Sequence, residues 1–123
     1  MKDKKRLYIL SALIIVIISG FIIWGMKQTG GPQSDIIYYY SKDCPHCQDV
    51  GKFLDDNKIA EKVQFEKKEV GSNVKNALEM QKRAGECKVD PKNLGVPFVW
   101  ARGKCFIGEP DVENFFKQEA GIK

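Results

Sequence analysis

The chain has 123 residues, with 20 lysines and arginines, 16 aspartates and glutamates, and a formal net charge of +4. This length allows one small domain with an appendage. Five of the basic residues and one of the acidic residues precede residue 28, so the remaining charges balance at fifteen of each sign. A domain with equal numbers of positive and negative side chains does not indicate a nucleic-acid-binding surface, and we expect no nucleic-acid partner.

The beginning of the chain has the pattern of a membrane anchor. Residues 1–6 (MKDKKR) are basic, and residues 7–26 (LYILSALIIVIISGFIIWGM) carry no charged side chain. A helix of this length spans about 30 Å, the thickness of a bilayer's hydrocarbon core. Tyr8 and Trp24 lie near its two ends, where aromatic rings favour the interface. A cleaved signal peptide has a shorter apolar run and a small-residue cleavage site, so we predict a retained transmembrane helix at 7–26.

The basic flank sets the predicted orientation of this anchor. Lysines and arginines beside a membrane span stay in the cytoplasm, so residues 1–6 are expected inside. The protein is then a single-pass protein of the cytoplasmic membrane, with everything after the anchor outside the cytoplasm. Residues 27–34 (KQTGGPQS) have the composition of a flexible linker, and residues 35–123 are expected to form one domain. Disulfides persist outside the cytoplasm, and the chain's four cysteines allow two pairs.

The domain alternates predicted strands and helices. In chain order we predict a strand at Ile36–Tyr40, a helix at 45–57, a strand at 63–70, a helix at 73–84, a loop at 86–95, strands at 96–101 and 105–107, and a helix at 111–120. Within the 73–84 helix, Val74, Ala77, Leu78 and either Met80 or Gln81 are expected to face the core, and Gly85 is expected to end the helix. The order is βαβ followed by αββα. It predicts an α/β fold with a four-stranded mixed sheet flanked by helices, preceded by the transmembrane helix.

Residues 44–47, Cys-Pro-His-Cys, carry the main chemical signal. Cys44 follows the first predicted strand and begins the first predicted helix, where free N–H groups and the helix dipole favour its thiolate. His46 adds a hydrogen-bond donor beside the sulfur. Cys47 lies one turn later on the same side, within reach of a disulfide. We predict Cys44 as the exposed nucleophile, Cys47 as the resolving thiol, and Cys44–Cys47 as a redox-active disulfide.

A metal site is the alternative interpretation of this motif. Cys87 and Cys105 are 18 residues apart and form no second Cys-x-x-Cys, so a zinc ribbon fits poorly. A metal-binding or metal-delivery module that uses Cys44, Cys47 and His46 remains open as an alternative of a different class. We expect neither a bound metal nor another cofactor.

The chain resembles the thioredoxin superfamily. The resemblance rests on a strand, the Cys-Pro-His-Cys motif, a helix, and a later Gly-Val-Pro before a hairpin that ends in Phe-Ile-Gly. The short form of the domain is similar to glutaredoxin-like members. The Cys-Pro-His-Cys tetrapeptide resembles that of DsbA-type oxidases and of domains that partner vitamin K epoxide reductase-type enzymes.

The resemblance implies further site residues. It implies that Pro97 is a cis-proline that faces the active cysteines and, with Val96 before it, docks extended substrate backbone. Two residues depart from the family pattern. Tyr38 stands where thioredoxins and DsbA-type proteins have a buried acid, and Asp43 stands where thioredoxins have an aromatic residue. Asp43 slightly opposes the thiolate of Cys44.

Cys87 and Cys105 are not part of the family pattern. In a small domain outside the cytoplasm, a structural disulfide between them is our first expectation, and a second redox pair is the alternative.

These observations predict a membrane-anchored, extracytoplasmic thiol–disulfide oxidoreductase. We expect it to oxidise the thiols of exported proteins, with a membrane enzyme of the DsbB or vitamin K epoxide reductase type reoxidising it. A reductase or electron-relay protein fed by a membrane partner is the alternative.

Overall fold

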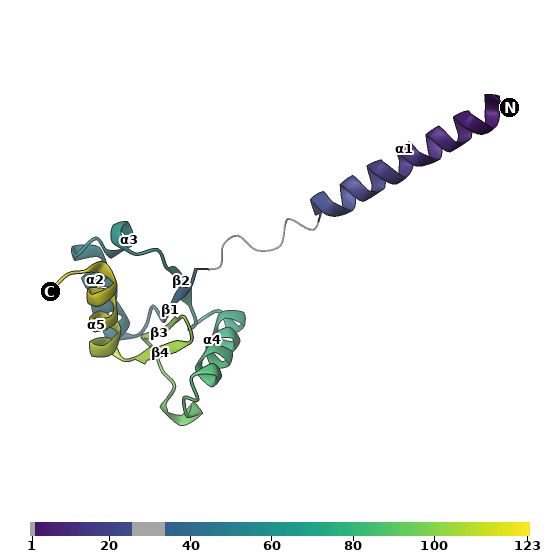
Figure 1. The fold of residues 1–123 in the computed structure, drawn as a ribbon. Coiled ribbons are helices and arrows are strands. Elements are labelled where there is room, and N and C mark those ends of the chain that lie inside the picture. Colours follow the sequence, from purple (N-terminus) through teal and green to yellow (C-terminus); the bar gives the residue numbers. More distant parts are fainter. Residues whose placement is uncertain (1, 26–33) are drawn as a thin grey trace. The chain divides into compact units, whose positions relative to one another are not determined.

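Two units make up the chain in the computed structural model, Met1–Gln33 and Ser34–Lys123. The structure describes residues 2–25 and 34–123, with side chains described for 2–20 and 34–123. The first unit contains helix α1 (Lys2–Gly25), shown at the N-terminus in Figure 1. The predicted linker at 27–34 lies outside the described residues, except for Ser34.

The predicted transmembrane helix at 7–26 is contradicted. Within residues 2–25 and 34–123, no helix is long and apolar enough to cross a membrane. Helix α1 begins with five charged residues, Lys2 to Arg6. The fold prediction is therefore wrong in this element.

The second unit is built on a four-stranded mixed sheet with the strand order β2-β1-β3-β4 (Figure 1). Its strands are β1 (Ile36–Tyr40), β2 (Glu66–Glu69), β3 (Phe98–Ala101) and β4 (Lys104–Ile107). Strand β1 pairs in parallel with β2 and antiparallel with β3, and β3 pairs antiparallel with β4. The predicted four-stranded mixed sheet is confirmed.

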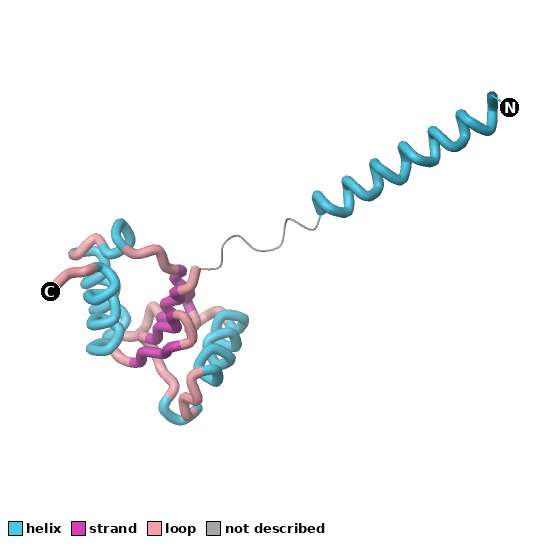
Figure 2. The backbone as a smooth tube through the Cα atoms, viewed as in Figure 1, coloured by secondary structure: helices cyan, strands magenta, loops and turns pink. Residues whose placement is uncertain are grey.

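Helices cover both faces of this sheet, as the tube in Figure 2 also shows. Helices α2 (Pro45–Asp56), α3 (Ile59–Lys62) and α5 (Glu109–Ala120) pack on one face, and α4 (Val74–Glu86) packs on the other. Side chains of a strand alternate between the two faces. Tyr38 accordingly belongs to the core under α2 and α5, whereas Ile37 and Tyr39 belong to the core under α4.

Aromatic rings fill the core between the sheet and α5. Phe116 is fully buried, with ring centroids 6.1 Å from Tyr38 and 4.9 Å from Phe65. The Phe115 ring packs against that of Phe106 in β4, with centroids 4.6 Å apart and the planes tilted. Val112 precedes these phenylalanines by one helical turn and is also fully buried. The 3.6-residue period of the helix places the three α5 residues on one stripe, which fixes α5 on the sheet.

The side of helix α4 that faces the sheet differs in part from the predicted one. Val74 and Leu78 are 74% and 60% exposed, whereas Met80, one of the two expected alternatives, is buried together with Ala84. Polar contacts hold the same side of the helix as Met80 and Ala84. Glu79 accepts a hydrogen bond from the buried Tyr39 hydroxyl at 3.0 Å and pairs with Lys68 at 2.7 Å.

A cation–π contact holds the same side of α4. The guanidinium of Arg83 lies 4.0 Å from the centroid of the Trp100 ring. Gly85, the expected end of the helix, lies inside it, and Cys87 is the C-cap. Val74 and Leu78 were therefore misleading, since the side of α4 that faces the sheet combines buried Met80 and Ala84 with the polar contacts of Glu79 and Arg83.

Other boundaries differ from the predictions by a few residues. Strand β2 is shorter than the predicted 63–70, because Val63 caps the short helix α3, which was not predicted. The expected loop at 86–95 contains a 3₁₀ turn, Pro91–Asn93. Helices α2 and α5 lie within three residues of their expected positions.

Two valines test which side of each helix stabilises the domain. Val112→Ala removes two buried methyl groups from the core under α5, and we expect it to lower the free energy of unfolding by about 2 kcal/mol. Val74→Ala is the matched control, because its side chain is exposed, and we expect a change within about 0.5 kcal/mol. Urea unfolding followed by circular dichroism measures both. An equal loss in the two variants would contradict this assignment.

Candidate redox-active site

The Cys-Pro-His-Cys motif lies directly after β1, at the start of α2. Cys44 is the N-cap of α2, with φ −93° and ψ 116°, and Pro45 occupies the first turn. Proline suits this position because its fixed φ is helical and the first N–H groups of a helix lack intrahelical partners. The backbone N–H of Cys47 donates to Cys44 Sγ at 3.3 Å. The sulfur thus replaces the usual oxygen of an N-cap, and this contact stabilises a negative charge on it.

Cys44 and Cys47 differ in accessibility. Both are free cysteines, but Cys47 is only 4% exposed, whereas Cys44 is half-buried. Burial raises the pKa of the Cys47 thiol to about 12, and its hydrogen bond and charge interaction with Cys44 add to the shift. Cys47 therefore stays a thiol near neutral pH. This arrangement supports Cys44 as the attacking sulfur and Cys47 as the resolving one.

The loop before β3 brings Val96 and Pro97 to the cysteines. The thiol of Cys44 donates to the carbonyl oxygen of Val96 at 3.7 Å, and the Val96–Pro97 peptide bond is cis. Pro97 is fully buried, and its carbonyl accepts from the N–H of Gly108 at 2.9 Å. The structure thus joins residues that are about 50 positions apart in the sequence.

A hollow of about 370 Å³ lies beside this contact. Its lining residues are His46, Val96, Pro97, Gly108, Glu109 and Pro110. A larger hollow of about 510 Å³ lies around residues 60–67 and contains none of the predicted site residues. The smaller hollow is therefore the one that belongs to the candidate site.

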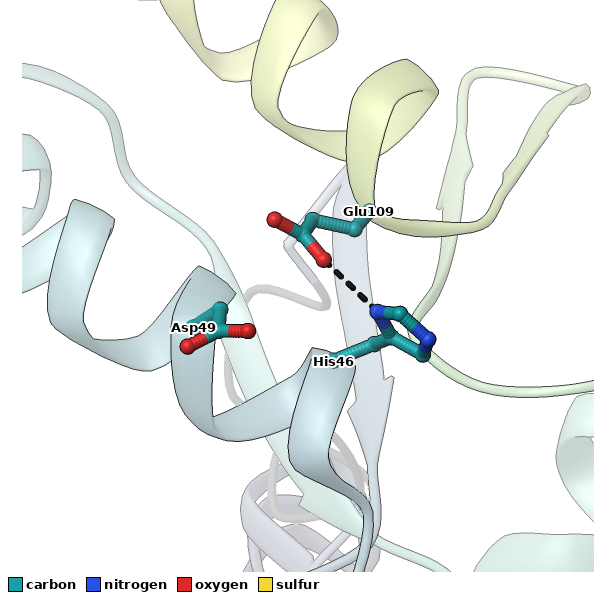
Figure 3. Close-up of side chains that lie close together, drawn as sticks. All are labelled: His46, Asp49 and Glu109. Atoms are coloured by element: carbon teal, nitrogen blue, oxygen red, sulfur yellow. Dashed lines mark hydrogen bonds and ion pairs between the residues drawn. The ribbon is translucent and has the colours of Figure 1, made fainter.

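His46 has a partner that the sequence did not predict. Its Nδ1 lies 2.7 Å from Oε2 of Glu109, the first residue of α5, and the His46 side chain is 70% exposed (Figure 3). We expected the ring to act mainly on the sulfur of Cys44, but the hydrogen bond observed for it goes to Glu109. Acidic residues are common in the first turn of a helix, so only the fold could identify Glu109 as a site residue.

Tyr38 stands at the position where thioredoxins and DsbA-type proteins have a buried acid. Its side chain is fully buried, and its hydroxyl donates to the carbonyl oxygen of Cys47 at 3.5 Å. Burial raises the pKa of Tyr38 well above its ordinary value, and the nearby Cys47 and Cys44 add to this. Tyr38 therefore stays a neutral phenol whose hydroxyl supports the backbone of α2.

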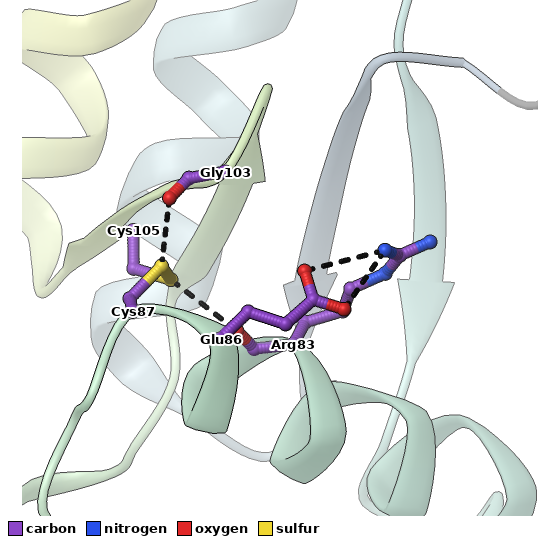
Figure 4. Close-up of a disulfide and its surroundings, with 5 residues drawn as sticks. All are labelled: Arg83, Glu86, Cys87, Gly103 and Cys105. Carbon is purple, nitrogen blue, oxygen red and sulfur yellow. Dashed lines mark hydrogen bonds and ion pairs between the residues drawn. A yellow bond between two sulfur atoms is a disulfide. The ribbon is translucent and has the colours of Figure 1, made fainter.

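Cys87 and Cys105 form a disulfide, with their Cα atoms 6.1 Å apart (Figure 4). Cys87 caps the end of α4, and Cys105 pairs across the sheet with Trp100 of β3. Cys105 packs in the core under α4, whereas Cys47 belongs to α2 on the opposite face of the sheet. The sheet thus separates the two cysteine pairs, and this favours a structural role for the disulfide.

Comparison with known proteins gives structural similarity only. No protein-family model matches the chain, and no curated protein matches it. Three solved structures are similar in fold. A variant of the thioredoxin-like protein BC3987 is 24% identical, with 72% of this chain and 97% of that chain covered and a TM-score of 0.48. A glutaredoxin from Archaeoglobus fulgidus is 20% identical, with 68% of this chain and 86% of that chain covered and a TM-score of 0.47. A wheat glutaredoxin is 18% identical, with 72% of this chain and 76% of that chain covered and a TM-score of 0.48. We therefore infer function from the site residues themselves.

Alkylation at varied pH tests whether the thiols of Cys44 and Cys47 differ in reactivity. In a Cys47→Ala variant, Cys44 should react with iodoacetamide near neutral pH. In a Cys44→Ala variant, buried Cys47 should react very slowly, with a rate that rises as the pH approaches the raised pKa of about 12. The sign follows from burial, which disfavours the charged thiolate. The unfolded variants serve as controls and should react alike. Equal rates in the folded variants would contradict the assignment.

Removing the disulfide tests its structural role. Replacing Cys87 and Cys105 with alanine should destabilise the domain by about 2–4 kcal/mol, which lowers the melting temperature by roughly 10 °C or more. Thiol exchange at Cys44 should be largely retained, because the sheet separates the two pairs. A variant in which serine replaces Cys44 and Cys47 is the control and should show the opposite result. Lost exchange in a well-folded Cys87/Cys105 variant would indicate a redox relay instead.

Proposed function

We propose that the second unit is a thiol–disulfide oxidoreductase whose redox couple is Cys44–Cys47. The observation that carries the proposal is the N–H of Cys47 pointing at Cys44 Sγ at 3.3 Å, while the Cys47 side chain itself is buried. Cys44 presents a partly accessible sulfur that accepts the Cys47 N–H, and the Cys47 sulfur lies buried one helical turn later. Thiol–disulfide exchange needs these two different roles.

In the oxidising direction, the couple begins as a Cys44–Cys47 disulfide. A substrate thiolate attacks Cys44 Sγ, the bond to Cys47 breaks, and the Cys47 sulfur takes up a proton. The substrate's second thiolate then attacks the substrate sulfur of the mixed disulfide and releases Cys44 as a thiolate. The substrate loses two electrons and gains a disulfide, and the couple gains the two electrons. A reductase runs the same steps in reverse.

The contact between Cys44 and Val96 suggests where a substrate chain lies. The Val96 carbonyl is 3.7 Å from the attacking sulfur, and the neighbouring hollow is bordered by Pro97 and His46. An extended substrate segment placed along Val96 and Pro97 would bring its cysteine to Cys44. We propose this segment as the substrate-binding surface for protein thiols or disulfides.

We favour oxidation as the working direction. Stabilising the Cys44 thiolate stabilises the reduced form, which makes the disulfide form a stronger oxidant. The carboxylates of Asp43, next in sequence to Cys44, and of Glu109, which binds His46, oppose this effect. The N-cap hydrogen bond acts directly on the sulfur, so we give it the greater weight.

We propose an oxidising compartment outside the cytoplasm as the place of action. The Cys87–Cys105 disulfide supports this, because such bonds persist where thiols are not kept reduced. The substrates would then be exported proteins. A membrane redox enzyme of the DsbB or vitamin K epoxide reductase type would accept the two electrons and restore the Cys44–Cys47 disulfide.

The metal-binding alternative with Cys44, Cys47 and His46 receives little support from the geometry. Cys47 is buried, and the ring of His46 is bonded to Glu109. Where metal-ligating side chains gather among the described residues, the cluster contains His46 but neither cysteine.

The reduction potential tests the proposed function and its direction. Equilibration with glutathione buffers should give a reversible two-electron couple that is lost in Cys47→Ala. We expect a potential above about −200 mV, compared with about −270 mV for thioredoxin, because the N-cap hydrogen bond stabilises the reduced form. Quantifying the thiols trapped at each buffer ratio measures it. A couple at or below the thioredoxin value would favour the reductase, and no reversible couple would reject the function.

A further inference from the structure

His46, Asp49 and Glu109 form a compact cluster at the edge of the redox-active site (Figure 3). Each offers one ligand atom, and these atoms all lie within 4.8 Å of one another. His46 and Asp49 are three residues apart on α2, so they share one side of the helix. Glu109 is the first residue of α5, which packs on the same face of the sheet.

The ligand set is one that divalent transition metals accept. Zinc binds imidazole nitrogen and carboxylate oxygen at about 2.0–2.2 Å, often through three protein ligands with water in an open position. Two ligands of one ion lie about 3 Å apart at such bond lengths. The 2.7 Å between His46 Nδ1 and Glu109 Oε2 is close to this separation. A histidine and a carboxylate three residues apart on a helix also occur together in metal sites of helical bundles.

The charges of the cluster also favour a cation. Two carboxylates, Asp49 and Glu109, approach the same imidazole, and like charges at this range repel each other. The N-termini of α2 and α5 act against a cation, but each carries only about half a positive charge. The two full negative charges therefore exceed the two partial positive charges. Because the residues are largely exposed, we expect reversible binding and no structural metal.

The adjoining hollow leaves room for the rest of a coordination shell. His46 and Glu109 both line it, and its volume of about 370 Å³ accommodates several water molecules. Neither Cys44 nor Cys47 contributes a ligand atom to the cluster. The site therefore differs from a thiolate site in ligand type and in position.

We propose that His46, Asp49 and Glu109 bind a divalent transition-metal ion such as Zn²⁺, with water as the remaining ligands. Nitrogen and oxygen ligands without sulfur suit Zn²⁺ and similar ions. A bound ion would place positive charge two residues from Cys44 and occupy the edge of the hollow beside Pro97. The proposal does not depend on thiol exchange, since its ligands are not the redox cysteines.

Zinc titration of the untagged full chain tests this site. The protein carries serine at positions 44 and 47, so neither redox thiol is available. Calorimetry should show one Zn²⁺ bound per chain. Asp49→Asn and Glu109→Gln should each weaken binding by more than about tenfold. Asp111→Asn is the matched control, because Asp111 is in the same first turn of α5 but outside the cluster, and it should bind as the parent does.

The imidazole provides a second readout. His46 is the only histidine of the chain, so its ring signals in an NMR spectrum need no further assignment. Added Zn²⁺ should shift these signals in the parent and in Asp111→Asn, and much less in Asp49→Asn. The proposal is overturned by a lack of binding, by binding that ignores Asp49 and Glu109, or by binding that appears only when Cys44 and Cys47 are restored. None of these results would alter the measured potential, so the two proposals fail separately.

Discussion

One hydrogen bond organises the candidate site, the contact from the Cys47 backbone N–H to the sulfur of Cys44. It closes the first turn of α2 with a sulfur where most helices use an oxygen. The same turn that begins the helix therefore gives its two cysteines different properties. The sulfur of Cys44 lies half-buried at the helix terminus and faces the Val96 carbonyl, whereas Cys47 is buried.

The sheet supports the first turn of α2, and the Cys-Pro-His-Cys motif lies on one of its two faces. Buried Tyr38 of β1 contacts the backbone of α2 from below, and the aromatic cluster around Phe116 holds α5 against the same face. Glu109, at the start of α5, is thereby held beside His46. The disulfide at Cys87 lies under the other face, where it joins the end of α4 to β4.

The sequence predicts the local part of this arrangement well. The Cys-Pro-His-Cys spacing indicates a helix start with one sulfur at its end, and the alternation of strands and helices indicates the mixed sheet. It does not predict contacts that depend on tertiary packing. Glu109 is 63 residues from its partner His46, and α4 turns its Glu79 and Arg83 side to the sheet although Val74 and Leu78 are more apolar. At residues 7–26 the sequence pattern itself was misleading. An uncharged run of spanning length predicted a membrane span, whereas no described helix is long and apolar enough to be one.

The burial of Cys47 also bears on how the protein withstands oxidants. If Cys44 is the reactive sulfur, as proposed, a small oxidant such as peroxide meets it first and converts it to a sulfenic acid. Left alone, that group can be oxidised further to sulfinic and sulfonic acids, which are not readily reversed. Here a sheltered thiol stands one helical turn away and can condense with the sulfenic acid, releasing water and forming the Cys44–Cys47 disulfide. In the proposed redox couple, the geometry that separates an attacking from a resolving sulfur would thus convert the sulfenic acid to a disulfide, which another thiol can reduce again.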